Sequence, residues 1–130
     1  MIEFHLDPRS GVATYLQLER QVRQAIRLRH LRPGDRLPTA REVVGHLAIN
    51  PNTVLKAYRE LERVGLVAGR PGLGTFVIGE LPAPSPAQVE SLRRGLRRWL
   101  DSAHGAGLDD DGIDGLIEDA RRESAKSQVA

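Results

Sequence analysis

Residues 50–65 have the sequence NPNTVLKAYRELERVG, which predicts one helix with a marked beginning and a marked end. Asn50 suits the N-cap, because its side-chain oxygen can accept a hydrogen bond from a free N–H of the first turn. Pro51 suits the position after the cap, where no N–H is needed. Gly65 suits the left-handed residue that ends a helix.

The side chains of this helix divide into an apolar face and a polar face. The apolar residues recur at helical spacing and are Val54, Ala57, Tyr58, Leu61 and Val64. The others are short hydrogen-bonding groups followed by cations, namely Asn52, Thr53, Lys56, Arg59 and Arg63. Side chains that can pair with base edges and with phosphates predict a helix that enters a DNA groove. We expect Tyr58 to lie in the core rather than to stack on a base.

A shorter helix is expected directly before this one. Thr39 and Glu42 have the spacing of a capping box. The apolar side chains that follow on one side are Val43, Val44 and Leu47. Only residues 46–49 separate this helix from Asn50, and they lack the glycine that is usual in such a turn. Two helices joined by a tight turn, the second polar at its start, predict a helix-turn-helix.

Beyond Gly65 the sequence predicts a β-hairpin. Residues 66–68 and 75–78 are short apolar runs typical of strands, and they flank the glycine-rich segment 69–74. Glycines let the backbone at the tip of such a hairpin approach a phosphate backbone closely. Together with the two helices before it, the hairpin predicts an N-terminal winged helix-turn-helix, so the fold class is mainly α with a small β-hairpin.

The segment before the helix-turn-helix is expected to hold a strand and a helix. Alternating apolar residues predict a short strand over residues 2–6, with no evident pairing partner. Thr14 and Gln17 have capping-box spacing and predict a helix that runs to about Arg29. Residues 31–38 predict a turn that brings an extended piece across the fold. The buried face of the helix is expected to consist of Tyr15, Leu18, Val22, Ala25 and Ile26.

A proline-rich segment divides the chain. We assign residues 1–79 to the winged helix-turn-helix, 80–86 to a semi-rigid linker and 87–130 to a helical tail. The first tail helix is expected to have its cap at Ser85 and to end at residues 104–107. The second is expected from about Asp111 to Ser124, followed by a frayed end at residues 127–130.

The tail helices carry apolar stripes that two short helices cannot bury against each other alone. We expect a second copy of the chain to cover these stripes in a two-fold dimer. The alternative is that the tail docks on the first domain of its own chain. The residues predicted to form the dimer interface are Val89, Leu92, Leu96, Trp99, Leu100, Ile113, Leu116 and Ile117.

Charge is distributed unevenly along the chain. Residues 1–79 hold 12 of the 19 Lys and Arg residues but 7 of the 17 Asp and Glu residues, a balance of +5, whereas the remainder has a balance of −3. A cationic half beside an acidic half is expected when one part meets a polyanion. The chain has no cysteine and no apolar run long enough to span a bilayer, and its first residues lack the basic and apolar regions expected of a secretory leader. We therefore expect a cytoplasmic protein whose partner is double-stranded DNA and not a membrane.

Catalytic and metal-binding patterns are weak. The four histidines show no ligand spacing, and no Gly-x-Ser-x-Gly elbow is present. Residues 109–112 and Glu118 match part of a calcium loop, but acids at the start of a helix are more simply explained by the helix dipole. We therefore predict no enzyme, no metal and no cofactor. The alternative to a DNA-binding regulator is a winged-helix module that binds acidic proteins and has no operator.

Three motifs together resemble the GntR family of bacterial transcriptional regulators. They are PGDRLPTARE at 33–42, NPNTV at 50–54 and GLGTFV at 72–77, and their order and spacing match over residues 12–78. The short helical tail, in place of a large effector-binding domain, resembles the YtrA-like subfamily. The resemblance implies a homodimeric DNA-binding repressor, often encoded beside transporter genes that it controls, with a tail that mainly dimerises. A small-molecule effector is not identified by the sequence.

The resemblance also implies which residues contact DNA. Arg41 falls where family members use an arginine at the start of the second helix, and Gly72 falls at the tip of the wing. Positions 71 and 73 are often basic in such wings but are Pro71 and Leu73 here, so the charge of the wing rests mainly on Arg70. The residues predicted to bind DNA are Arg41, Asn50, Pro51, Asn52, Thr53, Lys56, Arg59, Arg70, Gly72 and Gly74. The other interpretation of Arg41 is an ion pair with a surface acid.

Overall fold

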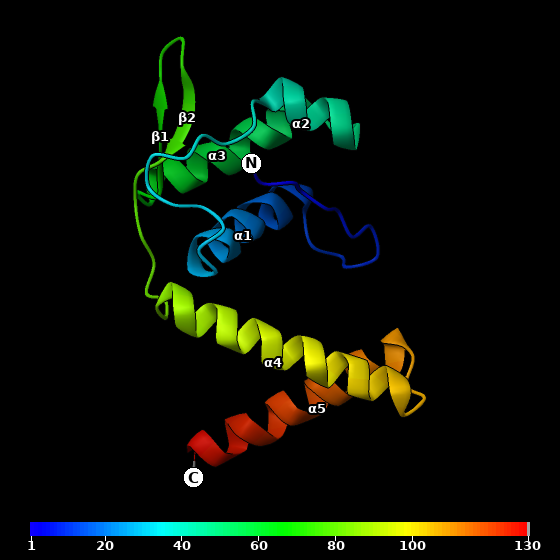
Figure 1. Ribbon diagram of the computed structural model, residues 1–130. Coiled ribbons are helices and arrows are strands. Elements are labelled where there is room, and N and C mark those ends of the chain that lie inside the picture. The colour runs from blue at the N-terminus through cyan, green and yellow to red at the C-terminus, as the bar shows by residue number, and fades with distance from the viewer. Residues whose placement is uncertain (130) are drawn as a thin grey trace. The chain divides into compact units, whose positions relative to one another are not determined.

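The computed structural model describes residues 1–129 (Figure 1). Within this range the chain forms five helices and one two-stranded antiparallel sheet. Its contacts divide it into two compact units, one spanning residues 1–86 and the other beginning at Ala87. The predicted fold class, mainly α with a small β-hairpin, is confirmed.

The first unit holds three helices and the hairpin. Its helices are α1 (Thr14–Arg27), α2 (Ala40–Leu47) and α3 (Pro51–Arg63), and its strands are β1 (Val67–Arg70) and β2 (Gly74–Val77). Helix α3 lies at the centre of this unit, since it contacts α1, α2 and β1. The largest side chains that are fully buried in the core are Leu18, Val22, Leu37, Val54, Leu61, Val67 and Val77.

The predicted start of α3 is confirmed. Asn50 Oδ1 accepts a hydrogen bond from the backbone N–H of Asn52 at 2.8 Å, and Pro51 is the first helical residue. The cap satisfies one of the N–H groups that have no partner inside the helix. The predicted apolar face is buried at Val54, Ala57, Tyr58 and Leu61.

Gly65 closes the carboxyl end of α3. This glycine has φ 81°, and its N–H donates to the carbonyl of Glu62 at 3.0 Å while the N–H of Leu66 donates to the carbonyl of Leu61 at 3.0 Å. These two bonds are the closing pattern that a left-handed residue allows. One prediction for this helix is wrong: Val64 is 41% exposed, because it is the C-cap and lies beyond the last turn of the apolar face.

The capping box of α2 is also confirmed. Thr39 Oγ1 accepts from the backbone N–H of Glu42 at 3.1 Å, and Glu42 Oε1 accepts from the backbone N–H of Thr39 at 3.4 Å. The turn into α3 has no glycine, and Ala48 adopts the left-handed conformation instead, with φ 52° and ψ 43°. The β-carbon of an alanine in this region costs about 1 kcal/mol, so the packing of α2 on α3 outweighs local strain here.

The strand predicted over residues 2–6 is wrong. This segment is extended, but within the described residues it pairs with no strand. The side chain of Gln21 accepts from the N–H of His5 at 2.9 Å and donates to the carbonyl of the same residue. One amide side chain of α1 therefore takes the place of a neighbouring strand. The predicted alternation of burial is confirmed, since Phe4 lies in the core.

The capping box predicted at Thr14 is wrong as well. The N-cap of α1 is Ala13, and no side chain caps the helix. Gln17 instead donates to the carbonyls of Asp7 at 3.1 Å and Val12 at 2.9 Å, because the preceding loop folds back over the start of the helix. The helix ends at Arg27, before the predicted end. Its buried residues are Leu18, Glu19, Val22, Ala25 and Ile26.

Residues 67–77, which we call the wing, form a regular hairpin, and a third extended segment lies beside it. The extended piece predicted before α2 lies along β2, where the N–H of Leu37 donates to the carbonyl of Thr75 at 2.8 Å and the N–H of Val77 donates to the carbonyl of Asp35 at 2.8 Å. The wing is therefore tied to the segment that leads into α2. The paired residues of its strands are Val67 with Val77, Ala68 with Phe76, Gly69 with Thr75 and Arg70 with Gly74.

The predicted linker begins on the surface of the first unit. Leu81 packs against the core cluster, and the Arg29 guanidinium donates to the carbonyl of Pro84 at 3.3 Å. Pro84 is thus held by a residue just beyond the end of α1.

The second unit contains α5 (Asp110–Val129) and all of α4 (Pro86–Gly105) except its first residue. The two helices diverge from their connecting turn (Figure 1). Across this turn His104 Nε2 lies 3.1 Å from Asp110 Oδ1. The predicted fraying is wrong for residues 127–129, which remain helical because no glycine or proline follows Gly115. Ala130 lies outside the described residues. None of the helices within residues 1–129 combines the length and the apolar character needed to cross a bilayer.

Candidate nucleic-acid interface

Helix α3 presents a polar ridge on the side opposite the core. At about 100° per residue, four side chains fall within about 60° of arc, on the far side from the buried Val54 and Leu61. We call these residues the reading ridge, and they are Asn52, Lys56, Arg59 and Arg63. All four are exposed. The ridge therefore offers one amide and three cations to a partner along the length of the helix.

The first turn of α3 holds four of the residues predicted to bind DNA. Asn50 and Pro51 are exposed, but Asn50 Oδ1 is already engaged as the cap of the helix. Asn52 is exposed and its side chain forms no hydrogen bond with residues 1–129. Thr53 is half-buried, since it lies at the edge of the ridge. Of these four, Asn52 is the side chain best placed to read a base edge.

Lys56 has a partner within the protein. Its Nζ lies 3.9 Å from the centroid of the Tyr15 ring of α1. Such a contact is worth about 0.5 to 1 kcal/mol at an exposed site, so it orients the ammonium without holding it irreversibly. Lys56 and Arg59 line a groove of about 490 Å³ between α1 and α3. Its floor includes Glu19, a buried carboxylate that pairs with Arg23 at 2.9 Å.

The two arginines of the reading ridge differ in their surroundings. Arg63 Nε donates to Glu60 Oε1 at 3.0 Å, one turn away on the same helix. This hydrogen bond lowers the pKa of the Glu60 carboxyl and raises the pKa of the Arg63 guanidinium. Arg59 forms no hydrogen bond or ion pair with residues 1–129. The unneutralised charge of the ridge therefore comes from Lys56 and Arg59.

Arg41 is free at the start of α2. It is exposed and forms no ion pair within the part of the chain that the structure describes. Its neighbour Glu42, a candidate partner, is engaged by Thr39 and by Arg36, whose Nη1 lies 3.2 Å from Glu42 Oε1. The interpretation of Arg41 as one half of a surface ion pair is therefore not supported, and its guanidinium is available to another molecule.

Arg36 and Tyr58 make contacts within the chain that the sequence did not predict, although the burial of Tyr58 was expected. Arg36 lies opposite Phe76 in the segment along β2, and its guanidinium reaches the capping box of α2. Tyr58 of α3 donates from its hydroxyl to the carbonyl of Pro38 at 2.6 Å. Burial raises the pKa of this hydroxyl, so it stays protonated and remains a donor. One short segment thus links the wing, α2 and α3. In the sequence, the signal for this link is Arg36, which lies in the predicted turn shortly before the cap Thr39.

This network predicts a loss of stability in acid. The backbone N–H of Thr39, the hydroxyl of Thr39 and the guanidinium of Arg36 donate to Glu42, and they lower the pKa of its carboxyl. A lowered pKa stabilises the fold above the pKa of the unfolded chain, and this contribution disappears as the pH falls through the folded-state value. We expect the free energy of unfolding to decrease less steeply with falling pH in Glu42→Gln than in the wild type. Chemical denaturation across acidic pH measures this effect.

The matched control for this prediction is Glu3→Gln. It removes an exposed carboxylate that accepts no hydrogen bond within residues 1–129. The prediction would be contradicted if the free energy of unfolding decreased equally steeply with falling pH in the wild type, in Glu42→Gln and in Glu3→Gln.

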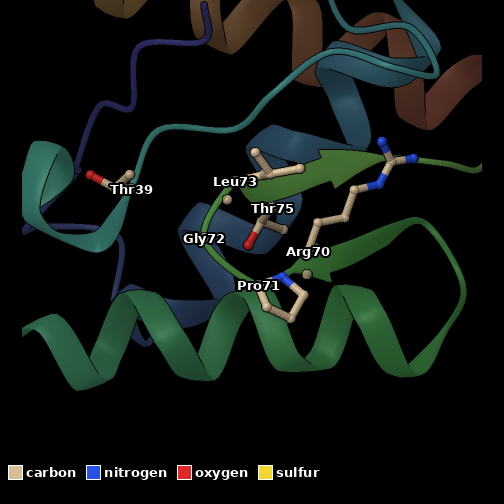
Figure 2. Close-up of a pocket in the computed structure, with 8 residues that line it drawn as sticks. Thr39, Arg70, Pro71, Gly72, Leu73 and Thr75 are labelled. Atoms are coloured by element: carbon tan, nitrogen blue, oxygen red, sulfur yellow. The ribbon is translucent and has the colours of Figure 1, made fainter.

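An open cleft of about 590 Å³ separates the wing from the start of α2. Figure 2 shows Thr39 on one side of this cleft and the tip of the wing, with Pro71, Gly72 and Leu73, on the other. Arg70 points away from Thr39, and its guanidinium carbon lies 4.9 Å from the centroid of the Phe76 ring. The structure therefore brings Arg70, Gly72 and Gly74 to one cleft and the cations of α3 to another groove.

Known proteins with this sequence pattern are regulators of transcription. A family model described as "Bacterial regulatory proteins, gntR family" matches residues 14–77, which span α1 through the end of the wing. The "HTH-type transcriptional repressor YtrA" of Bacillus subtilis is 33% identical over 105 residues, which cover 80% of this chain and 81% of that protein. The chain belongs to the GntR family.

Solved structures support membership of the GntR family. A YtrA from Sulfolobus acidocaldarius, described as a GntR-family transcription factor, superposes with a TM-score of 0.55 at 30% identity and covers 75% of this chain and 97% of that one. The DNA-binding domain of AraR in complex with the operator ORX1 superposes with a TM-score of 0.50 at 26% identity and covers 57% of this chain and 92% of that one. This GntR-family chain is therefore a transcriptional regulator with a winged DNA-binding domain.

Proposed function

We propose that the protein is a sequence-specific DNA-binding repressor that inserts α3 into the major groove. The observation that carries this proposal is the reading ridge: one amide and three cations on the face opposite the core, with Arg41 unpaired at the start of the adjacent helix. An α-helix fits the major groove, where each base pair presents a distinct pattern of donors and acceptors. Helix α2 then crosses the DNA backbone and braces α3.

The ridge side chains differ in what they contact in this proposal. Asn52, at the leading end of α3, pairs with a base edge, since an amide matches adenine, and Arg41 pairs with guanine or a phosphate. Lys56 and Arg59 pair with phosphates, which position the helix but do not select a sequence. The Tyr15 ring holds the Lys56 ammonium in place before DNA arrives.

We further propose that two chains associate through the tail. Several of the predicted interface residues are exposed, with 66% exposure at Leu92, 54% at Leu96, 37% at Trp99 and 45% at Leu116. Val89 and Ile113 are already buried within the chain, so they offer little surface to a partner. A second copy covers this apolar face in a closed two-fold dimer, which needs only one kind of interface.

A two-fold dimer implies a pseudo-palindromic operator. Its half-sites lie about 34 Å apart, or about one helical turn, when both copies of α3 enter the same face of the DNA. Binding at a promoter then excludes the polymerase, and the similarity to the B. subtilis transcriptional repressor YtrA supports repression rather than activation. Neighbouring transporter genes are the proposed targets. In this proposal residues 1–79 bind DNA, 80–86 form the linker and the tail dimerises.

Salt dependence separates the two classes of contact in the ridge. We expect Lys56→Ala to weaken binding to all sequences alike and to reduce the slope of log affinity against log salt by about one. Asn52→Ala should relax the preference at one base pair, at a cost of about 1 to 3 kcal/mol, and leave the slope unchanged. Electrophoretic titration of operator and mutated operators at several salt concentrations measures both quantities.

Arg20→Ala is the control for the charge effect. It removes an exposed cation from α1 on the side that faces away from α3, so it should change neither the slope nor the base preference. A wild-type slope in Lys56→Ala would remove this lysine from the set of phosphate contacts.

Selection from random duplexes tests the proposal as a whole. Enrichment of an inverted repeat is the expected result for a dimeric repressor. A pool without any consensus would favour the alternative, a winged-helix module whose basic face binds acidic proteins.

A further inference from the structure

The end of α1 is closed by an arginine in a conformation that favours glycine. Arg29 follows the C-cap Leu28, and its φ is 63°. The N–H of Arg29 donates to the carbonyl of Ile26 at 3.2 Å, and the N–H of His30 donates to the carbonyl of Ala25 at 2.8 Å. Helices often close with this pair of bonds, and the left-handed position between them is most often glycine. The β-carbon of Arg29 therefore has a cost that the closure of the helix does not require.

The side chain of Arg29 makes a contact that glycine could not make. Its Nε and its Nη2 both donate to the carbonyl oxygen of Pro84 at 3.3 Å, across 55 residues of chain. We call this contact the clasp. Arg29 is half-buried, which is consistent with a guanidinium held against the surface of the first unit. The strained position at the end of α1 thus places a cationic donor on the segment that leads to the tail.

Residues 78–84, which we call the strap, are attached to the first unit at three points. At the start of the strap, the N–H of Ile78 donates to the carbonyl of Leu66 at 2.9 Å. In the middle, Leu81 packs against the core cluster. The clasp holds the far end at Pro84. The strap is therefore part of the first unit along its whole length, and the clasp is its last attachment before α4.

The clasp determines how much chain separates the last attachment from α4. With the clasp closed, only Ser85 lies between Pro84 and the first residue of the helix, Pro86. Without the clasp, the last attachment is Leu81, and residues 82–85 lie between it and the helix. A proline-rich segment extends by about 3.1 Å per residue, so the three additional residues give each chain about 9 Å of extra reach.

We infer that Arg29 determines which spacing of half-sites the protein accepts. The inference rests on the proposed function, in which two linked winged domains bind the two half-sites of one operator. Both domains can bind at once only where the separation of the half-sites matches the reach of the linkage. Each base pair adds about 3.4 Å to that separation. The 9 Å that the clasp withholds in each chain therefore corresponds to about two to three base pairs.

Arg29→Gly tests this role of the clasp. The substitution removes the guanidinium and suits the left-handed conformation, so the variant should unfold at or above the wild-type temperature. Titration of duplexes whose selected half-sites are moved apart by two base pairs measures the tolerance. The wild type is expected to lose most of the gain from binding both half-sites, a factor of about 10² or more. In Arg29→Gly the same change should weaken binding by less than about tenfold.

A second measurement reports on the clasp without DNA. Nuclear magnetic relaxation gives the order parameters of the backbone N–H groups of Ala83 and Ser85. We expect values of about 0.85 in the wild type and below about 0.6 in Arg29→Gly, because the end of the strap is then released. Unchanged order parameters in the variant would overturn the inference. Lowered order parameters together with a wild-type dependence on spacing would overturn it too.

Arg27→Ala is the matched control, since it removes an exposed cation from the last turn of the same helix. We expect wild-type order parameters and wild-type dependence on spacing in this control. The slope of log affinity against log salt should be the same in the wild type and in Arg29→Gly, because the clasp involves no phosphate.

Two further outcomes distinguish the inference from the function on which it rests. A smaller salt slope in Arg29→Gly, with an unchanged dependence on spacing, would assign Arg29 to a phosphate contact and overturn the inference. Failure of the wild type to select an inverted repeat would overturn the proposed function, and with it the role of Arg29 in spacing. The order parameters would then still decide whether the clasp forms.

Discussion

The double variant Leu92→Glu with Leu96→Glu is expected to be monomeric and to bind its operator about 10² to 10⁴ times more weakly. Both leucines lie one turn apart on α4 and are 66% and 54% exposed, so neither change creates a cavity within the chain. Two carboxylates on each copy would face each other across a two-fold interface, and repulsion would add to the lost apolar burial. A monomer then binds each half-site separately, without the effective concentration that a linked second domain supplies.

The matched control places the same two charges on the opposite side of the same helix. Ala87→Glu with Ser91→Glu has the same spacing, and both positions are exposed. We expect this control to remain a dimer with wild-type affinity. Sedimentation equilibrium gives the mass of each variant, and titration of full operators and single half-sites gives the affinities. A leucine variant that stays dimeric would show that α4 does not form the interface.

Leu61→Ala is expected to lower the free energy of unfolding by about 2 to 5 kcal/mol. This leucine is fully buried in the core of the first unit, on the helix that contacts α1, α2 and β1. Truncation removes its transfer free energy and leaves a cavity that rigid neighbours cannot fill. Since small domains are stable by about 5 to 15 kcal/mol, we expect operator binding to fall at high temperature and to recover on cooling.

Leu55→Ala is the control for this core substitution. It makes the same chemical change on the same helix at a side chain that is 40% exposed, so the loss should stay below about 1 kcal/mol. Urea unfolding at one fixed chain concentration compares the two, because the stability of a dimer depends on concentration. Equal losses in both variants would show that Leu61 is not a core residue.

The helices of the winged domain could be predicted closely because their signals are local. Asn50, Pro51 and Gly65 act on atoms within a few residues of themselves, and the structure shows them in the expected roles. The Thr39–Glu42 capping box is equally local and equally well predicted. The spacing of apolar residues identified the buried face of α3, since burial on a helix follows its period.

The predictions that are wrong concern polar groups with distant partners. Gln17 has the spacing of a cap but bonds to the loop at Asp7, and Gln21 replaces a strand for the segment around His5. Both partners lie at least ten residues away along the chain, and only the packing of the loop on α1 brings them near. A spacing rule within one helix cannot anticipate such competition.

The candidate site shows the same division between local features, which the sequence predicts, and contacts between distant residues, which it does not. Residue type and helical period predicted the polar face of α3, and the family resemblance implied Arg41. The sequence did not identify the contact of Lys56 with Tyr15 or the bridge from Arg36 to Glu42. That bridge matters for the interpretation of Arg41, because it engages Glu42, which would otherwise be a candidate partner of Arg41.

By itself, the sequence determined where α2 and α3 begin, where α3 ends, which faces are apolar and which family the chain resembles. Helix caps, helical period and glycine stops depend on residues that are close together in the sequence, so they can be recognised from the sequence alone. Only the tertiary structure decided which polar side chains are engaged and which are free. A side-chain hydrogen bond forms with whatever group packing brings within about 3 Å, and for Arg36, Gln17 and Gln21 that group comes from another element.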